Sequence, residues 1–256
     1  MILAIDVGNT NTKLGFFGDN GTLDKFFSIP SDSKRTASET SKLIEKYIAE
    51  LGVKSSDVTG AAMSSVIPEA TGAVASAVER VFGVKPIAVS PTLNLGMEID
   101  YAPPTGLGSD RIVTCVAAKI KYGYPLVLVD FGTATTVNVV DARGAFVGGA
   151  ITLGIKSTMA SLVKCTAKLP CVEPEIPHAA VGKSTADAIK SGVVLGAVGQ
   201  VKYLIERVKK ELGLHNAKTV ATGGLASLVQ EIEPMFYAVD KSLSLEGLYE
   251  IYKLNN

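Results

Sequence analysis

The sequence predicts an α/β protein in which two mixed sheets are flanked by helices, and two observations carry this prediction. Short apolar runs of strand length alternate with helical stretches along nearly the whole chain of 256 residues, a pattern typical of sheets covered by helices. A motif also occurs twice, because residues 5–12 (IDVGNTNT) and 129–136 (VDFGTATT) share an apolar strand end followed by Asp, Gly and Thr at equal spacing. This echo predicts two related halves, 1–122 and 123–256, with a cleft between them, and a chance match stays the alternative.

In the first half, apolar periodicity predicts each element. Residues 2–5 and 13–17 flank a turn rich in Gly, Asn and Thr and are predicted to form a hairpin. The apolar residues between 43 and 51 fall on one face of a 3.6-residue period, which predicts a helix over 36–51. The further predicted elements are a strand at 60–67, a helix at 69–82, a strand at 86–90, a loop at 92–108 and a helix at 109–121.

The second half is predicted to open with a three-stranded meander. Its strands are expected at 125–129, 133–140 and 145–151. A long helix is expected at about 185–212, where Gly192, Gly196 and Gly199 recur at spacings of four and three and suggest close contact with another domain or subunit. The further predicted elements are a helix near 156–163, a strand at 219–221 and a final helix, strand and helix.

Composition excludes several classes of protein. The chain has 25 basic and 25 acidic residues and is 47% hydrophobic, which disfavours disorder and the basic surface of a general nucleic-acid binder. It has three Cys without a CxxC pair and two His, so we expect neither a disulfide framework nor a structural zinc site, and place the protein in a reducing cytoplasm. Catalysis is therefore expected to depend on carboxylates.

No membrane or export segment is expected. The apolar residues 1–5 are interrupted by Asp6 and lack a basic flank, unlike a signal peptide. No continuous apolar run approaches the length of about 18 residues that a spanning helix needs.

The turn at residues 6–13 carries groups that can bind phosphate. Gly8 allows close approach of the backbone, turn amides and hydroxyls can donate to anions, and Lys13 adds a positive charge. Asp6 at the strand end can hold Mg²⁺ through water. The alternative is a hairpin turn, rich in Asn and Thr, that binds nothing.

A second candidate is Asp110 with Arg111, where the long loop passes into a helix. A carboxylate there can accept a proton from an attacking hydroxyl, and the Arg can bind an anionic substrate, as in phosphoryl transfer. The alternative is that Asp110 caps the helix. The segment 220–225 runs from a strand into glycines at a helix start, where a nucleotide or phosphate could meet backbone amides, and the alternative is an ordinary turn. The segment 181–185 carries a Gly, a cation and two hydroxyls before the long helix, and the alternative is an ordinary helix cap.

Taken together and in order, these motifs resemble the type III pantothenate kinases over the whole chain. They are LAIDVGNTNTKLG from residue 3, GLGSDRIV from 106, VDFGTATTVNVV from 129, GGAITLGI from 148, TAKLP from 166, VGKSTADAIKSGVV from 181 and ATGGL from 221. The resemblance implies the superfold of acetate and sugar kinases, Hsp70 and actin, whose two ribonuclease-H-like halves would account for the echo. It also implies a cytoplasmic homodimer that phosphorylates pantothenate with ATP, in the first step of coenzyme A synthesis, using Mg²⁺ and K⁺ or NH₄⁺.

The resemblance implies a role for each matching residue. The expected ATP contacts are Asp6, Val7, Gly8, Asn9, Thr10, Asn11, Thr12, Lys13 and Thr133, with Asp6 also holding Mg²⁺ through water and Asp130 holding the monovalent cation. Asp110 would be the general base. The expected pantothenate contacts are Tyr101, Gly108, Ser109, Asp110, Arg111 and Thr185, the last from this subunit or its partner. The chain departs from the family in having Ser109 where Ala is usual, and in the segment 102–106, which lacks the usual Asn-Pro.

Two other functions are considered. An ATP-binding regulator or non-kinase ATPase on the same superfold would need neither the base at Asp110 nor the substrate clamp at Arg111. A sugar or acetate kinase would fit the superfold, but neither the short chain nor the GSDR and TAKLP motifs.

Overall fold

The computed structural model describes all residues from 1 to 256. The chain forms two compact units, one of residues 1–117 and 242–256 and the other of residues 118–241. These units differ from the expected ranges 1–122 and 123–256 mainly at the C-terminus, because the last helix packs on the first sheet. The compact units are defined by contacts within the chain, whereas the expected ranges are defined by the repeated motif. The two ribonuclease-H-like ranges therefore stay a prediction.

Each unit contains one five-stranded sheet, and the two sheets are built alike. The orders are β3-β2-β1-β4-β5 and β8-β7-β6-β9-β10. In both, the first three strands pair antiparallel and the remaining two pair parallel. The strands are β1 Ile2–Val7, β2 Asn11–Phe17, β3 Leu23–Pro30, β4 Gly60–Ser65, β5 Ile87–Ala88, β6 Leu126–Phe131, β7 Ala134–Val140, β8 Phe146–Leu153, β9 Lys218–Thr222 and β10 Ala238–Val239. The mixed α/β architecture and the repeated arrangement of strands agree with the sequence prediction.

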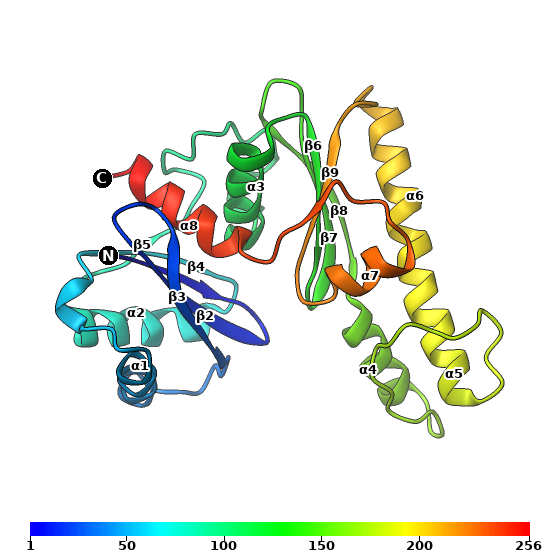
Figure 1. Cartoon of the computed structure of the whole chain (residues 1–256), viewed down its shortest axis with the longest axis horizontal. Helices are drawn as coiled ribbons and strands as arrows, with labels where there is room; N and C mark the ends of the chain where they lie inside the picture. The colour runs from blue at the N-terminus through cyan, green and yellow to red at the C-terminus, as the bar shows by residue number, and fades with distance from the viewer. The chain divides into compact units, whose positions relative to one another are not determined.

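Helices α1 (Ala37–Leu51) and α2 (Pro68–Phe82) cover one face of the first sheet, as Figure 1 shows. Thr36 caps α1: its hydroxyl accepts from Glu39 N, and the Glu39 carboxylate accepts from Thr36 N. This reciprocal pair satisfies two amides that would otherwise lack partners at the helix end. Apolar side chains of strands and helices meet between the two layers and form the core of this unit.

The other face of the first sheet is covered by α8 (Leu243–Leu254), which contacts β1, β2 and β4. Helix α3 (Ser109–Tyr122) starts in the same unit. Gly247 of α8 lies against the backbone of Val113, so closely that a Cβ at residue 247 would overlap the Val113 carbonyl. The C-terminal helix is thereby fixed against both the sheet and the helix that begins beside Asp110.

The second sheet packs against helices α4 (Ile155–Cys165), α6 (Gly196–Glu211) and α7 (Ala226–Ile232). The long helix expected from residue 185 is formed as α5 (Thr185–Lys190), a π-helical turn at Ser191–Leu195, and then α6. A π turn inserts one extra residue into a helix and is often found at functional sites. The apolar face of the π turn and α6, with Val194, Val198 and Val201, lies in the core of the second unit.

The segment Thr185–Glu211 is long and apolar enough to cross a membrane by length and composition, with a mean window hydropathy of 1.2. The sequence prediction, which looked for a continuous apolar run, did not identify it. One such helix is weak evidence, because core helices of water-soluble proteins also meet this criterion, and a third of the window is buried. A Cβ added at Gly192, Gly196 or Gly199 would have no neighbour within 4 Å, so within the chain these glycines do not make the close contact expected of them.

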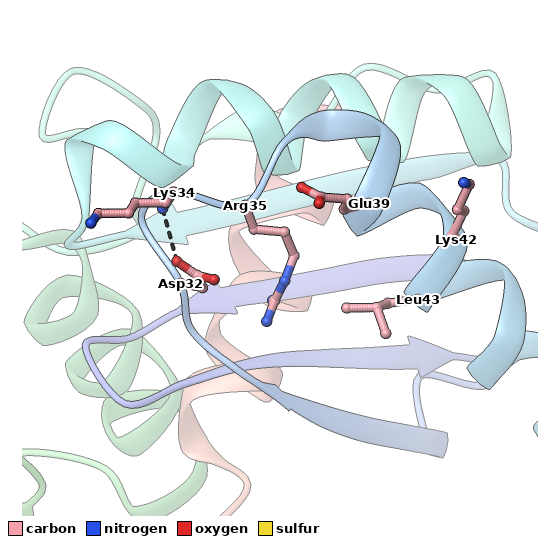
Figure 2. A pocket seen from close by; sticks show the side chains of 6 residues that line it. All are labelled: Asp32, Lys34, Arg35, Glu39, Lys42 and Leu43. Atoms are coloured by element: carbon pink, nitrogen blue, oxygen red, sulfur yellow. Dashed lines mark hydrogen bonds between the residues drawn. The ribbon is translucent and has the colours of Figure 1, made fainter.

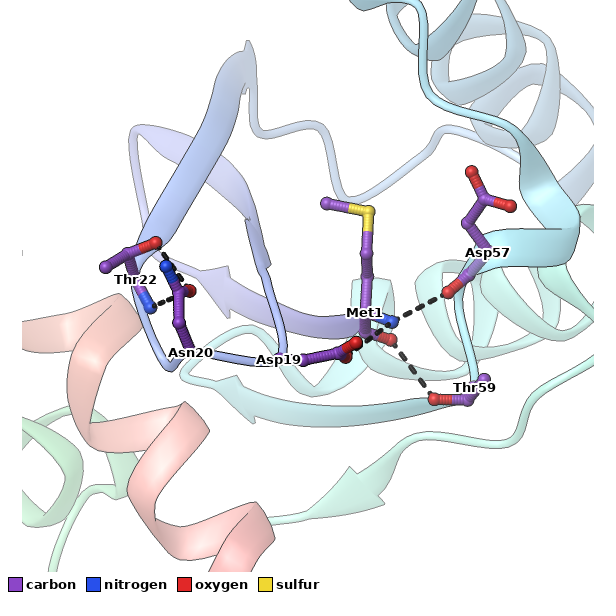
Figure 3. A network of polar contacts seen from close by, with 6 residues as sticks. All are labelled: Met1, Asp19, Asn20, Thr22, Asp57 and Thr59. Atoms are coloured by element: carbon purple, nitrogen blue, oxygen red, sulfur yellow. Dashed lines mark hydrogen bonds and ion pairs between the residues drawn. The ribbon is translucent and has the colours of Figure 1, made fainter.

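Two short segments hold the beginning of β1 in place. The Met1 ammonium donates to the Asp57 carbonyl at 2.8 Å and lies 3.9 Å from the Asp19 carboxylate (Figure 3). In the adjacent β2–β3 turn, the Asn20 Oδ1 atom accepts from both Thr22 N and Thr22 Oγ1. Because Asp19 is fully exposed, its ion pair contributes little, and the bond to Asp57, in the 3₁₀ turn Ser55–Asp57, is the firmer anchor.

The structure differs from the sequence prediction most clearly at β3, which the sequence analysis did not identify. Its Phe27 and Ile29 are buried, whereas Phe26 is exposed. Charged residues at its start and Pro30 at its end are typical of an edge strand. They obscure the alternation of apolar and polar residues by which a strand is predicted from sequence. The loop expected at 92–108 is largely irregular, with one 3₁₀ turn at Pro104–Gly106.

Candidate active site

Three polar side chains from neighbouring strands meet at the end of β1. Strand pairing places Lys13 of β2 and Ser64 of β4 directly beside Asp6, and therefore on the same face of the sheet. Ser64 Oγ donates to Asp6 Oδ1 at 2.9 Å, and Lys13 Nζ lies 3.9 Å from Asp6 Oδ2. The Asp6 carboxylate is thus held between a hydroxyl and an ammonium group on the face opposite the apolar core.

The turn that follows Asp6 exposes its middle and buries its ends. Gly8 N donates to the Asn11 carbonyl at 3.1 Å, which closes the turn. Asn9 and Thr10 are exposed, whereas the side chains of Val7 and Thr12 are buried. Within residues 6–13, the groups that can reach a ligand are therefore the middle side chains, the turn backbone and Lys13, while Val7 and Thr12 point inward.

Asp110 is the second residue of α3 and has a perturbed carboxyl group. Burial raises the pKa of Asp110, and the negative charge of Asp6 raises it further, against the opposing effects of the Arg111 amide and guanidinium. The Arg111 amide donates to Asp110 Oδ1 at 2.8 Å. A partly buried carboxylate with increased proton affinity is suited to accept a proton from a bound hydroxyl.

Ser109 ties the start of α3 to the end of β4. Its Oγ accepts from Ser65 N at 3.1 Å and donates to the Ser65 carbonyl at 3.2 Å. Consecutive residues of β4, Ser64 and Ser65, therefore contact Asp6 and the residue before Asp110. Sequence reasoning missed this pair, because two serines at the end of a short strand match no motif and pairing between distant segments decides their role.

The expected pantothenate residues in the first unit come together around Asp110. Arg111 is buried, and its guanidinium carbon lies 5.8 Å from the centre of the Tyr101 ring, which is a cation–π distance. A Cβ at Gly108 would lie 2.5 Å from Asp110 Oδ1. Glycine at residue 108 therefore leaves the space that the Asp110 carboxylate occupies.

In the second unit, Asp130 is paired with two threonines. Strand register places Thr136 of β7 and Thr222 of β9 beside it on the same face. Gly223 follows with a φ of +93°, and a Cβ there would lie 2.5 Å from Asp130 Oδ1. The surroundings of this carboxylate thus contain oxygen-bearing side chains and a close backbone turn.

Thr133 and Thr185 are exposed parts of the second unit. The Thr133 carbonyl accepts from Gly154 N at 3.0 Å and from Ser157 Oγ at 2.7 Å, so α4 holds the turn after β6. Thr185 is the first residue of α5, and Ser184 caps that helix by accepting from Asp187 N at 3.1 Å. The capping alternative considered for the segment 181–185 is therefore formed, and the Thr185 side chain remains accessible.

A pocket of about 410 Å³ lies beside the β3–α1 connection (Figure 2). Its lining residues are Asp32, Lys34, Arg35, Glu39, Lys42 and Leu43. Both carboxylates serve the local backbone, since Asp32 Oδ1 accepts from Lys34 N and Glu39 caps α1. No residue expected to bind ATP or pantothenate lines this pocket.

No group of three or more His, Cys, Asp and Glu side chains that could hold a metal ion is present. The three cysteines are free, and Cys165 and Cys171 are exposed. Single carboxylates such as Asp6 and Asp130 still fit cations that keep most of their water or bind substrate phosphates, as Mg²⁺ does.

A sequence model of the type III pantothenate kinases matches residues 2–207, which is most of the chain and includes Asp6, Asp110, Asp130 and Thr185. This chain belongs to the type III pantothenate kinase family. It is accordingly a phosphotransferase.

Solved structures with the same fold belong to proteins described with different functions. A conserved Campylobacter jejuni protein, provisionally described as a Baf family transcriptional activator, has a TM-score of 0.57 and 21% identity, covering 98% of this chain and 97% of its own. The ADPNP-bound activator of 2-hydroxyisocaproyl-CoA dehydratase from Clostridium difficile has a TM-score of 0.55 and 12% identity, with 98% and 93% covered. A polyphosphate/ATP-glucomannokinase from an Arthrobacter strain has a TM-score of 0.52 and 11% identity, with 98% of each chain covered. At these identities the likeness establishes the shared fold alone.

Proposed function

We propose that the protein transfers the γ-phosphoryl group of ATP to the primary hydroxyl of pantothenate and forms 4'-phosphopantothenate, the first step of coenzyme A synthesis. The observation that carries this proposal is the environment of Asp110. The carboxyl pKa of Asp110 is raised by burial and by Asp6. Gly108, two residues earlier, leaves room for the carboxylate, and the next residue, Arg111, is buried. Family membership supports the same reaction class.

In the proposed reaction, Asp110 accepts the proton of the pantothenate hydroxyl as that oxygen attacks the γ-phosphorus in line with the departing ADP oxygen. The bond between the γ-phosphorus and the bridging oxygen breaks, and ADP leaves with the electron pair. Arg111 attracts the pantothenate carboxylate, and Tyr101, stacked against the guanidinium, limits the positions that Arg111 can take. Gly108 and Ser109 shape the wall next to the base, and Thr185 adds a further contact from this subunit or from the partner in a homodimer.

The turn at residues 6–13 is proposed to bind the ATP phosphates. Backbone amides near Gly8 and the ammonium of Lys13 face the anion, and the exposed Asn9, Thr10 and Asn11 add polar contacts. In the second unit, Thr133 is proposed to contact the nucleotide. Oriented donors of this kind offset the negative charge of the transferred group without reorganisation during the reaction.

Two cations are proposed to accompany the substrates. Asp6 would hold Mg²⁺ through water, and Asp130, beside Thr136 and Thr222, would hold K⁺ or NH₄⁺. When bound, such cations neutralise phosphate charge. The residues fit this role, because Asp6 keeps part of its carboxylate exposed after accepting from Ser64, and Asp130 lies among oxygen-bearing side chains.

The test is ADP release by the wild-type protein and by Asp110→Asn, each with and without pantothenate. The proposal expects release that depends on pantothenate and is stimulated by K⁺ or NH₄⁺, and a loss of roughly a hundredfold or more in turnover for Asp110→Asn with ATP binding retained. Equal ADP release without pantothenate would support an ATP-binding regulator or non-kinase ATPase instead. Near-normal turnover of the variant would exclude Asp110 as the base. Light scattering tests the proposed homodimer, and cell fractionation tests the cytoplasmic location.

A further inference from the structure

The turn between β1 and β2 is closed from outside by one residue, Ser31, which follows β3. Ser31 N donates to the Thr10 carbonyl at 2.9 Å, and Ser31 Oγ donates to the Gly8 carbonyl at 2.6 Å. Ser31 Oγ also lies 3.0 Å from Thr12 Oγ1. One residue thus contacts three positions of the turn, in addition to the internal bond from Gly8 N to the Asn11 carbonyl.

The direction of these bonds follows from the number of protons. A serine hydroxyl has one proton and two acceptor lone pairs. Because the short bond to the Gly8 carbonyl uses that proton, the proton between the two hydroxyls must come from Thr12. Thr12 is buried, and its hydroxyl proton is already engaged, so it cannot donate to a phosphate oxygen while this arrangement persists.

The position of Ser31 explains why the contact exists. The β2–β3 ladder ends with Asn11 opposite Pro30, and proline has no amide proton with which to extend the ladder. Ser31, one residue further on, donates to Thr10 and so extends the pairing into the turn itself. The segment after it is also held: Arg35 Nη1 donates to the Pro30 carbonyl at 2.9 Å, and Lys34 N donates to Asp32 Oδ1, the bond drawn in Figure 2.

From these contacts we infer that Ser31 is a positioning residue that fixes the turn, through the backbone of Gly8 and Thr10 and the side chain of Thr12, for binding of the ATP phosphates. The inference rests on the proposed function of that turn. Amide groups bind a phosphate well only when their directions are already set, since ordering them on binding costs free energy. Ser31 sets those directions without itself contacting the nucleotide, and Thr12 acts through Ser31.

The test compares Ser31→Ala with Ser31→Thr, which keeps the hydroxyl, and with Ser33→Ala. Ser33 is exposed and lies two residues away, so its variant is a matched control. The measurements are KM for ATP and for pantothenate, kcat, calorimetric binding of a non-hydrolysable ATP analogue, and hydrogen exchange of the amides at residues 8–12. Thermal unfolding of each variant verifies that it is folded.

For Ser31→Ala we expect KM for ATP to rise roughly fivefold or more, as the loss of one or two hydrogen bonds predicts, with kcat and KM for pantothenate changed less than about twofold. Exchange of the turn amides should accelerate, Ser31→Thr should restore both values, and Ser33→Ala should match the wild type. An unchanged ATP affinity and unchanged amide exchange in Ser31→Ala would overturn the inference. If the wild type shows no pantothenate-dependent ADP release, the proposed function fails, while analogue binding and amide exchange still decide the role of Ser31.

Discussion

Asp6 and Asp130 hold the same position in two sheets of the same strand order. Each is the fifth residue of a six-residue strand at the centre of its sheet, flanked by one antiparallel and one parallel neighbour. Their partners differ: Lys13 and Ser64 lie beside Asp6, whereas Thr136 and Thr222 lie beside Asp130. A repeated framework thus presents one carboxylate with a cationic neighbour and one with neutral hydroxyl neighbours, which suits two different ligands.

Ser64→Ala should impair the function proposed for Asp6. The substitution removes the hydroxyl that donates to Asp6 Oδ1 and frees the carboxylate to rotate. Loss of such an outer partner costs roughly tenfold in metal affinity or activity, which a titration of kinase activity with Mg²⁺ measures. The control is Ser41→Ala, because Ser41 is also a buried serine of this unit and donates to the Ala37 carbonyl. Both variants should lose about 1 kcal/mol of stability; an equal loss of activity in both would contradict the prediction.

Gly223→Ala should destabilise the second unit, whereas Gly224→Ala should not. A Cβ at residue 223 would lie 2.5 Å from Asp130 Oδ1 and 2.6 Å from Phe131 N, and the φ of +93° is strained for any side chain. A Cβ at residue 224 has no neighbour within 4 Å. Denaturant unfolding should show a loss of about 2 kcal/mol or more for the first variant and less than about 0.5 kcal/mol for the second. Similar losses for both would show that residue 223 tolerates a side chain.

Asp110→Asn should stabilise the protein at neutral pH. The folded-state pKa of Asp110 is raised, chiefly by burial, so the group favours folding most when it is protonated, below its unfolded pKa, and that contribution is lost as the pH rises through the folded pKa. Asparagine stays neutral and can still accept from the Arg111 amide. Thermal unfolding should therefore give a higher Tm for the variant at pH 7, with the difference shrinking as the pH falls toward the ordinary aspartate range. A lower Tm for the variant at pH 7 would contradict this.

The same shift in pKa predicts how activity depends on pH. If ionised Asp110 is the base, activity falls as the pH drops through its pKa, and that acid limb lies above the range of an ordinary aspartate. Measuring kcat/KM for pantothenate as a function of pH locates this acid limb. An acid limb at or below the ordinary aspartate range would assign it to another group.

Asp240→Asn should destabilise the second unit more than removal of a surface ion pair. Asp240 is buried and accepts from Tyr122 Oη at 2.7 Å, and Lys121 Nζ lies 2.7 Å from the same carboxylate. We expect a loss of about 1–3 kcal/mol in the free energy of unfolding. The comparison is Glu233→Gln, which breaks the exposed pair with Lys202 and should cost less than about 1 kcal/mol. Equal losses would mean that burial adds nothing to the Asp240 contacts.

Much of the fold could be predicted because local periodicity and capping agree with the final structure. The helix expected at 36–51 is α1 with Thr36 as its cap, and the meander expected from 125 is β6, β7 and β8. The edge strand β3 could not be predicted, because its sequence does not alternate clearly between apolar and polar residues. Its solvent-facing side carries both the charged Asp24 and the apolar Phe26. The antiparallel pairing with β2, which is present only in the folded structure, identifies this segment as a strand.

Motifs predicted the candidate site only in part. Asp6, Asp110 and Arg111 are identifiable because glycines and charges gather around them in the sequence. Ser31 and Ser64 are not, because their function depends on hydrogen bonds to residues 19 to 58 positions away in the chain. Likewise, Thr12 carries a hydroxyl suited to phosphate, but the structure turns it toward Ser31.

Sequence alone specifies the α/β class, the repeated strand-turn-strand that begins each sheet, the family, and the carboxylates proposed to act. These follow from short-range patterns, which a chain carries before it folds. Three further features emerge only from the folded chain: α8 joins the first unit, β4 braces both Asp6 and the start of α3, and Ser31 closes the turn. Such contacts join segments far apart in sequence, and only the packing of sheets and helices brings their polar groups within hydrogen-bonding distance.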